Sequence, residues 1–173
     1  MDDTFRVRLD AARRWEQALA AWVAKRGWHI LPTYDFCGKG DDKAPKLVAP
    51  PGQPGLVLPD LQCFKGGRVK WCECKWKARA DYYRKGGYRV TGISSRLLRE
   101  YEAVEKATNA QVVLTFLHEA EQEIRGAPIK ALRSSFSHAY SGPMMSHGGM
   151  VFWKYDAIPR WCALSALTET PCP

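Results

Sequence analysis

The sequence predicts a single α/β domain in which a mixed β-sheet is packed between helices. Apolar residues recur at helical spacing from about residue 3 to residue 26. Two β-rich runs, 56–64 and 69–77, flank a Gly-Gly pair and indicate a hairpin. A helix over 95–107 then leads into the apolar run 111–117, as expected for a crossover to a buried parallel strand.

Length and charge narrow the class of protein. The chain has 173 residues, of which 46% are apolar, enough for one domain with a proper core. Its net charge of +8 comes from 26 Lys and Arg against 18 Asp and Glu, which favours a polyanionic partner, nucleic acid first. No apolar run has the length of a membrane span, so we expect no membrane partner.

The cysteines and the first residues indicate a cytoplasmic, reducing environment. The chain begins with a polar, acidic segment that lacks the apolar core of a signal peptide. The six cysteines form no CxxC pair and no zinc-finger spacing, so we expect buried reduced thiols rather than disulfides or structural zinc. They are Cys37, Cys63, Cys72, Cys74, Cys162 and Cys172.

The first helix carries a carboxylate beside its apolar stripe. Leu19 and Trp22 belong to that stripe, and Glu16 lies on its flank, one helical turn from Leu19. One explanation is a boundary ion pair with Arg13 or another surface cation, worth under about 1 kcal/mol if exposed. The other is an acidic group directed at a functional site. The helix alone leaves both open.

The hairpin predicts a pair of acidic groups that face each other. If Gly66-Gly67 forms the two-residue turn, each residue before it has a defined partner after it. Residues directly opposite share one side of the sheet, with Cβ atoms about 4.5–5.5 Å apart. The pairs, counted outward from the turn, are Lys65–Arg68, Phe64–Val69, Gln62–Trp71 and Asp60–Glu73.

Two facing carboxylates repel each other unless a cation lies between them. Mg²⁺ is the first candidate, because it is commonly held by one or two carboxylates together with water and phosphate oxygens. Lys75 lies two residues beyond Glu73 and therefore projects from the same face. Its ammonium group is placed to hold an attacking water or to stabilise charge that develops on phosphorus. The hairpin is therefore a candidate site for phosphodiester cleavage. The alternative is an exposed hairpin whose Asp, Glu and Lys form ordinary surface ion pairs.

The same residues resemble the PD-(D/E)XK nuclease superfamily. The match consists of Pro59-Asp60 and, after the hairpin turn, the ExK triplet Glu73-Cys74-Lys75. The resemblance implies a restriction-endonuclease-like α/β/α sandwich, as in Holliday-junction resolvases, with a mixed sheet of four to five strands. It implies a Mg²⁺- or Mn²⁺-dependent nuclease that hydrolyses DNA, with junctions, flaps and ends as candidate structures and RNA left open.

The resemblance also implies roles for individual residues. Asp60, Glu73 and Lys75 would be catalytic. Glu16, Asp60, Glu73 and the backbone carbonyl of Cys74 would hold the metal ion. Enzymes of this kind often act as dimers, so a homodimer is a further expectation.

Basic and aromatic residues after the ExK strand indicate where nucleic acid would lie. Cations pair with phosphates, and tyrosine rings stack on unstacked bases. The alternative for residues 78–89 is a solvated hairpin whose tyrosines cover the edge of the core. Residues 38–55, rich in Gly and Pro, predict a flexible loop whose lysines reach the same backbone. The candidates are Lys39, Lys43, Lys77, Arg79, Tyr82, Tyr83, Arg84, Lys85, Arg89 and Arg96.

Two other functions compete with a metal-dependent nuclease. A non-catalytic nucleic-acid-binding module on the same fold would keep the basic surface, although the presence of Asp60, Glu73 and Lys75 together disfavours a decayed site. A metal-independent enzyme that uses His or Cys as nucleophile has no supporting Cys/His spacing.

Overall fold

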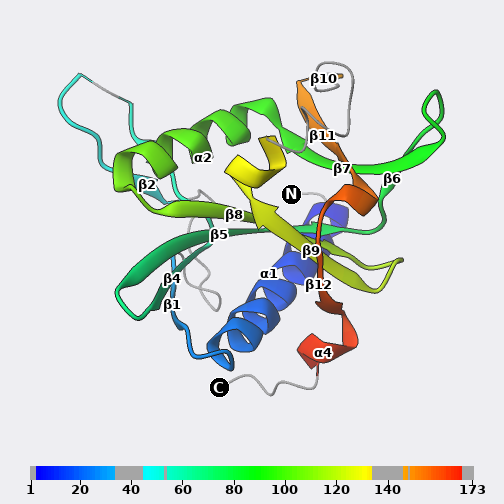
Figure 1. The fold of residues 1–173 in the computed structure, drawn as a ribbon, viewed down its shortest axis with the longest axis horizontal. Coiled ribbons are helices and arrows are strands. Elements are labelled where there is room, and N and C mark those ends of the chain that lie inside the picture. Colours follow the sequence, from blue (N-terminus) through cyan, green and yellow to red (C-terminus); the bar gives the residue numbers. More distant parts are fainter. Residues whose placement is uncertain (1–2, 34–44, 53, 134–145, 148, 169–173) are drawn as a thin grey trace.

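A computed structural model describes residues 3–33, 45–52, 54–133, 146–147 and 149–168 (Figure 1). Its main sheet has six strands in the order β1-β4-β5-β8-β9-β12. β5 and β8 run parallel, and the other neighbours are antiparallel, so the sheet is mixed as predicted. The strands are β1 (His29–Pro32), β4 (Leu61–Lys65), β5 (Arg68–Lys77), β8 (Gln111–His118), β9 (Glu123–Pro128) and β12 (Arg160–Ala163).

The predicted number of four to five strands was too low. β9 begins inside a run of alternating acidic residues that resembles a solvated loop. β12 has a register shift between Arg160 and Cys162, which interrupts the alternation that marks a strand in sequence. Both strands are short. β9 pairs with β8 and β12 pairs with β9, so each is defined by its neighbour rather than by a periodicity of its own.

Two layers cover the main sheet. On one face, α1 (Asp3–Ala24) and α4 (Ser165–Thr168) pack through Leu19, Trp22 and Leu167. On the other face, α2 (Ser95–Thr108) packs together with strands of a second sheet. That sheet has the order β10 (Ser146–His147), β11 (Met150–Lys154), β7 (Tyr88–Ser94) and β6 (Asp81–Tyr83). The α/β sandwich expected from the sequence is therefore confirmed.

The hairpin has the predicted register. Leu61 faces Cys72, Gln62 faces Trp71, and the pairing continues to Lys65 and Arg68. Gly66 and Gly67 form the turn with φ values of 53° and 72°, which only glycine adopts without strain. The strand β4 begins at Leu61, so Asp60 lies in the bend directly before it.

The helix α2 begins and ends where the sequence indicates. The side chain of Ser94 accepts a hydrogen bond from the backbone N–H of Leu97, at 3.2 Å, and so caps the helix. Asn109 ends it in the left-handed conformation, with φ of 51°. The chain then enters β8, whose apolar residues are buried on both faces of the sheet.

Part of the predicted loop at 38–55 is paired. β2 (Lys46–Leu47) forms an antiparallel ladder with β3 (Leu56–Val57), while residues 38–44 and 53 lie outside the described chain. β11 lies between β10 and β7 in the second sheet. Residues 129–133 and η1 (Tyr155–Ala157) complete the helical segments.

The described cysteines are free thiols, as expected. Cys63, Cys72 and Cys74 are buried and Cys162 is half-buried, whereas Cys37 and Cys172 lie outside the described residues. Among the described helices, none has the length and apolar character that crossing a membrane requires.

Candidate active site

Asp60 is held by hydrogen bonds from two neighbouring strands. The backbone N–H of Thr33, just after β1, donates to the carbonyl oxygen of Asp60 at 2.9 Å. The Thr33 hydroxyl lies 2.9 Å from the carbonyl oxygen of Pro59 and 3.0 Å from that of Asp60. On the other side, the backbone N–H of Cys74 donates to Asp60 Oδ2 at 2.7 Å. The carboxylate is therefore fixed against β5.

Glu73 is the most deeply buried acid of the site. Its side chain is 1% exposed, and it forms an ion pair with the ammonium group of Lys75. Both residues lie on one face of β5, as the period of two predicts. In the described structure no backbone N–H donates to the Glu73 carboxylate oxygens. The charge of Lys75 therefore balances that of Glu73, because a buried carboxylate is unstable without a cation.

Two residues that the motif did not indicate support Glu73. The hydroxyl of Thr115, on β8, donates to the Glu73 carbonyl oxygen at 2.6 Å. The phenol of Tyr101, on α2, lies beside the Glu73 carboxylate, and burial together with that charge raises the pKa of Tyr101. The sequence places Tyr101 on the buried face of a helix. A buried tyrosine needs a hydrogen-bond partner for its hydroxyl, and this was the feature of the sequence that could have indicated a polar contact for Tyr101.

Glu16 approaches from the α1 side of the sheet. Glu16 is 7% exposed, which is low for a glutamate on a helix. Its charge raises the pKa of both Asp60 and the Cys74 thiol, so the carboxylate lies near the site. This placement agrees with the explanation that gives Glu16 a part in the site, and its role as a metal ligand stays a prediction.

The positive charge of Lys75 only partly compensates the negative charge of the acids in the site. Burial and the charge of Glu73 raise the pKa of Asp60, Lys75 lowers it by less, and Glu16 raises it further. Burial lowers the pKa of Lys75, but Glu73 and Asp60 outweigh that effect, so the Lys75 pKa is raised. Lys75 is therefore a cation at neutral pH with two acidic neighbours, Glu73 and Asp60.

The chemistry of these donors fits a hard divalent cation. Carboxylate and carbonyl oxygens are the ligands that Mg²⁺ prefers, and the acids repel one another without a further positive charge. Within the described ranges, no three His, Cys, Asp or Glu side chains are grouped closely enough to hold a metal ion. The structure thus shows a pair of carboxylates with a lysine partner and a third acid nearby.

The predicted nucleic-acid contacts within residues 77–89 lie at the end of β5 and on or next to the β6–β7 hairpin. Burial and the neighbouring Lys75 lower the pKa of the half-buried Lys77, although Asp81 opposes that shift. Tyr82 is 63% exposed at the hairpin. The ring of the half-buried Tyr83 packs against that of Tyr88, with centroids 5.4 Å apart. The remaining candidates here, Arg79, Arg84 and Lys85, are exposed, and Lys39 and Lys43 lie outside the described residues.

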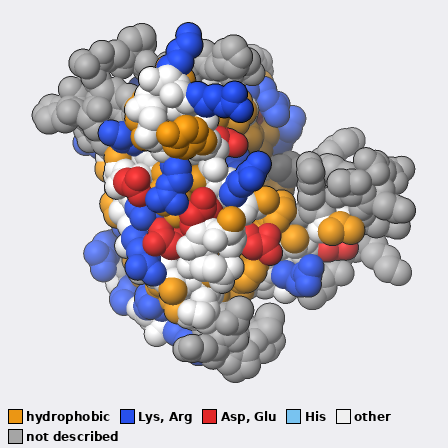
Figure 2. Space-filling view, turned by 90° about the vertical axis from the view of Figure 1, so that its right-hand side faces the viewer, with side chains coloured by type: hydrophobic (Ala, Val, Ile, Leu, Met, Phe, Trp, Pro, Cys, Tyr) orange, Lys and Arg blue, Asp and Glu red, His pale blue; other side chains and the backbone are white. Residues whose placement is uncertain are grey.

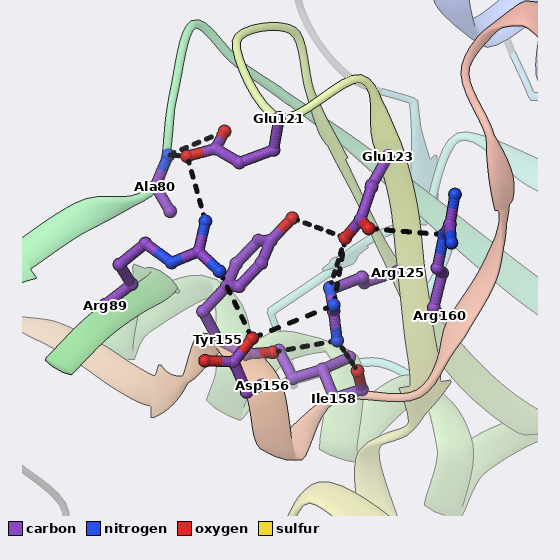
Figure 3. A network of polar contacts seen from close by, with 9 residues as sticks. All are labelled: Ala80, Arg89, Glu121, Glu123, Arg125, Tyr155, Asp156, Ile158 and Arg160. Atoms are coloured by element: carbon purple, nitrogen blue, oxygen red, sulfur yellow. Dashed lines mark hydrogen bonds and ion pairs between the residues drawn. The ribbon is translucent and has the colours of Figure 1, made fainter.

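Two of the predicted contacts have acidic partners. Arg89 lies 3.8 Å from Glu121 and 3.3 Å from Asp156 (Figure 3). Arg96, 73% exposed, lies 3.5 Å from Glu100 one helical turn away. Figure 2 shows that basic and acidic side chains are interspersed on the side of the molecule that it presents. Their role in binding nucleic acid stays a prediction.

A buried histidine lies near the end of β8. His118 is 0% exposed, and its Nε2 is 3.0 Å from the hydroxyl of Thr91. Burial, with the charges of Lys77 and Arg125, lowers the pKa of His118 to about 4. The ring is therefore neutral at physiological pH. Nothing in the apolar run 111–118 distinguishes this residue, so sequence reasoning missed it.

Comparison with known proteins supports the fold. The structure resembles that of the Holliday junction resolvase Hjc from Archaeoglobus fulgidus, with a TM-score of 0.51 and 12% sequence identity. The match covers 83% of this chain and 88% of the resolvase. No family model matches the sequence, and no curated protein matches it either. At this identity the likeness concerns the fold.

Proposed function

We propose that this protein is a Mg²⁺-dependent nuclease that hydrolyses DNA phosphodiester bonds. The observation that carries the proposal is the meeting of Asp60, Glu73 and Lys75 at one hairpin. Cys74 N–H holds Asp60, and Lys75 pairs with the buried Glu73. The resemblance of these residues to the PD-(D/E)XK pattern and the likeness to the resolvase fold support it independently.

Each residue of the site would have its own role in hydrolysis. Asp60 and Glu73 would hold the metal ion, with Glu16 and the Cys74 carbonyl as further ligands. A bound Mg²⁺ or Mn²⁺ supplies Lewis acidity and lowers the pKa of a coordinated water. Lys75 would orient the attacking water and stabilise negative charge on the phosphate oxygens. Tyr101 and Thr115 keep Glu73 in place from the neighbouring α2 and β8.

The structural neighbour makes branched DNA the first substrate to test. Its name describes a Holliday junction resolvase, and the fold likeness covers most of both chains. We therefore propose a four-way junction first and flaps or ends next, with RNA as a further candidate. Cleavage of two symmetric strands needs two sites, so a homodimer belongs to the same proposal.

A binding module without catalysis is the second candidate. One observation favours it: Lys75 already pairs with Glu73, and the described residues contain no assembled group of three metal-binding side chains. Such a module would bind nucleic acid through the basic surface and would not need a metal ion.

A panel of substrates separates these candidates. Labelled four-way junction, flap, duplex and single-stranded DNA, with matched RNA, are incubated with the full chain in Mg²⁺, in Mn²⁺ and in EDTA. The nuclease predicts metal-dependent products that disappear in EDTA and in the Asp60→Asn variant. Retained binding with no product under either metal supports the binding module and refutes the nuclease.

A further inference from the structure

A cleft lined by tryptophans lies on the α1 side of the sheet, away from the acidic residues. Its volume is about 310 Å³. This is within the usual range for small-ligand sites, which are largely apolar with a few polar groups. The side chains used below are Trp22, Arg26, Trp28, Lys70 and Trp161, all of which line it.

Rings and cations alternate around this cleft. The Trp22 and Trp161 rings are nearly parallel, at 10°, with centroids 6.2 Å apart. The guanidinium carbon of Arg26 lies 3.3 Å from the Trp22 ring centroid. On the other wall, Lys70 Nζ lies 5.7 Å from the centroid of Trp28. The cleft thus offers flat apolar surfaces next to positive charge.

Two of the rings keep open surface. Trp28 and Trp161 are half-buried, whereas Trp22 is buried, at 8% exposed. A tryptophan that only filled the core would have its ring covered by other side chains. Here the half-buried rings face an unfilled space, and Arg68, 5.8 Å from the Trp28 centroid, adds a further cation at the rim.

The chemistry of the cleft selects its ligand. A planar aromatic ring stacks on tryptophan, and a phosphate attached to that ring pairs with lysine and arginine. A nucleotide combines both groups, and the net charge of +8 favours a polyanion over a neutral aromatic compound. A base inside an intact duplex presents no free face, so the ligand must be unpaired and unstacked.

We infer that this cleft binds one unpaired nucleobase of the DNA substrate, stacked on Trp28 and Trp161, with the adjoining phosphates on Lys70 and Arg26. The inference rests on the proposed function, because it takes DNA as the substrate and adds how a departure from duplex structure is recognised. The cleft is then a specificity site and takes no part in the hydrolysis.

The strand β5 connects the cleft to the acidic site. Lys70, Cys72 and Cys74 project to the α1 face, because side chains alternate along the strand. Lys70 and Cys72 line the cleft, and the Cys74 N–H holds Asp60. From Lys70 to Lys75 the strand rises about 17 Å. Glu73 and Lys75 project to the opposite face of β5, so a strand that occupies both places passes around the sheet and needs more nucleotides than this rise alone requires.

Binding without metal tests the inference separately from cleavage. An eight-nucleotide single-stranded DNA is titrated into the full chain in EDTA, and tryptophan fluorescence is followed. We expect saturable quenching, with affinity at least about fivefold weaker in Trp28→Ala, the lower bound for loss of one base–aromatic stack. Trp28→Phe should restore most of the affinity, because it keeps a ring.

Charge is tested in the same titration. Lys70→Ala should weaken binding and lower its dependence on salt, as expected when a phosphate contact is lost. Lys106→Ala is the matched control, because Lys106 is an exposed lysine on α2 outside the cleft. A fully paired duplex of the same sequence should quench less than the single strand.

Photocrosslinking tests the cleft in the wild-type chain, so its result does not depend on whether a variant folds. A single strand that carries 5-iodouracil is irradiated with the wild-type chain, and the attached peptide is sequenced. Attachment at Trp28 or Trp161 supports the cleft. Attachment confined to the β6–β7 hairpin, unchanged affinity in Trp28→Ala, or no binding of the single strand each overturns it.

The two proposals fail in different ways. If the cleft binds the strand and no substrate is cut in Mg²⁺ or Mn²⁺, the nuclease is wrong and the cleft stands. If substrates are cut while the cleft variants bind single-stranded DNA as the wild type does, the cleft is wrong and the nuclease stands.

Discussion

Two groups of buried and half-buried acids in this protein have opposite electrostatics. In the network around Tyr155, Glu123 lies 2.9 Å from Arg125 and 3.2 Å from Arg160, and it accepts a hydrogen bond from the Tyr155 hydroxyl at 2.8 Å (Figure 3). Burial raises the pKa of Glu123, but these partners outweigh it and the pKa is lowered. At the hairpin, burial, Glu73 and Glu16 raise the pKa of Asp60, Lys75 lowers it by less, and the pKa of Asp60 is raised.

The difference separates a structural cluster from a functional one. An acid with complete partners stabilises the ionised form and thereby the fold. An acid that lacks compensation costs stability at neutral pH and is retained for another reason, such as a cation that binds during function. Substitutions that change one cluster at a time therefore have different expected effects in the two places.

The largest expected effect is on cleavage. Asp60→Asn should lower the rate of DNA hydrolysis in Mg²⁺ by at least about a thousandfold, because a metal ligand supplies several kcal/mol of transition-state stabilisation. Single-turnover cleavage of a junction measures it. Glu123→Gln, the matched acid-to-amide change in the other cluster, should stay within about twofold of the wild type. Equal losses in both variants would contradict the comparison.

The next effect concerns the stability of the lone ion pair. Lys75→Met should lower the free energy of unfolding by about 3 kcal/mol, because it leaves Glu73 charged and buried without its cation. Urea denaturation at pH 7 measures the change. Adding Glu73→Gln to that variant should recover most of the loss. No recovery would mean that Lys75 stabilises the protein through packing.

Glu123→Gln should have a smaller cost, about 2 kcal/mol, from the loss of charge-assisted hydrogen bonds to Arg125 and Tyr155. Because the folded pKa of Glu123 is lowered, its contribution is present above the unfolded pKa and is lost as pH falls through the folded value. Denaturation at pH 7 and at successively lower pH should show the two proteins converging in acid. A constant difference at all pH values would refute this origin.

The smallest effect has the opposite sign. Asp60→Asn should raise the free energy of unfolding by about 1 kcal/mol at pH 7, as replacements of strained functional groups often do. The folded pKa of Asp60 is raised, so the wild type loses stability as pH rises from the unfolded pKa through the folded value. The gain should therefore vanish in acid, below the unfolded pKa. Thermal denaturation across that pH range measures the gain. A gain that stays constant as the pH is lowered would contradict this origin.

Local sequence rules predicted the elements that carry their own period. The hairpin register followed from Gly66-Gly67, and the boundaries of α2 followed from Ser94 and from the apolar positions after it. Lys75 was placed beside Glu73 by strand alternation alone. The six-stranded extent of the sheet was missed, since β9 and β12 are recognisable only by what they pair with.

Contacts between distant segments decided everything that surrounds those elements. The chain positions Tyr101 beside Glu73, Thr33 beneath Asp60 and Glu16 near Asp60 from three other elements, and no spacing in the sequence relates them to the hairpin. The tryptophan cleft likewise joins α1, β5 and β12. Short-range geometry is fixed by backbone dihedrals and side-chain period, so the sequence determines it. Convergence across elements depends on how whole layers pack, and only the tertiary structure specifies that.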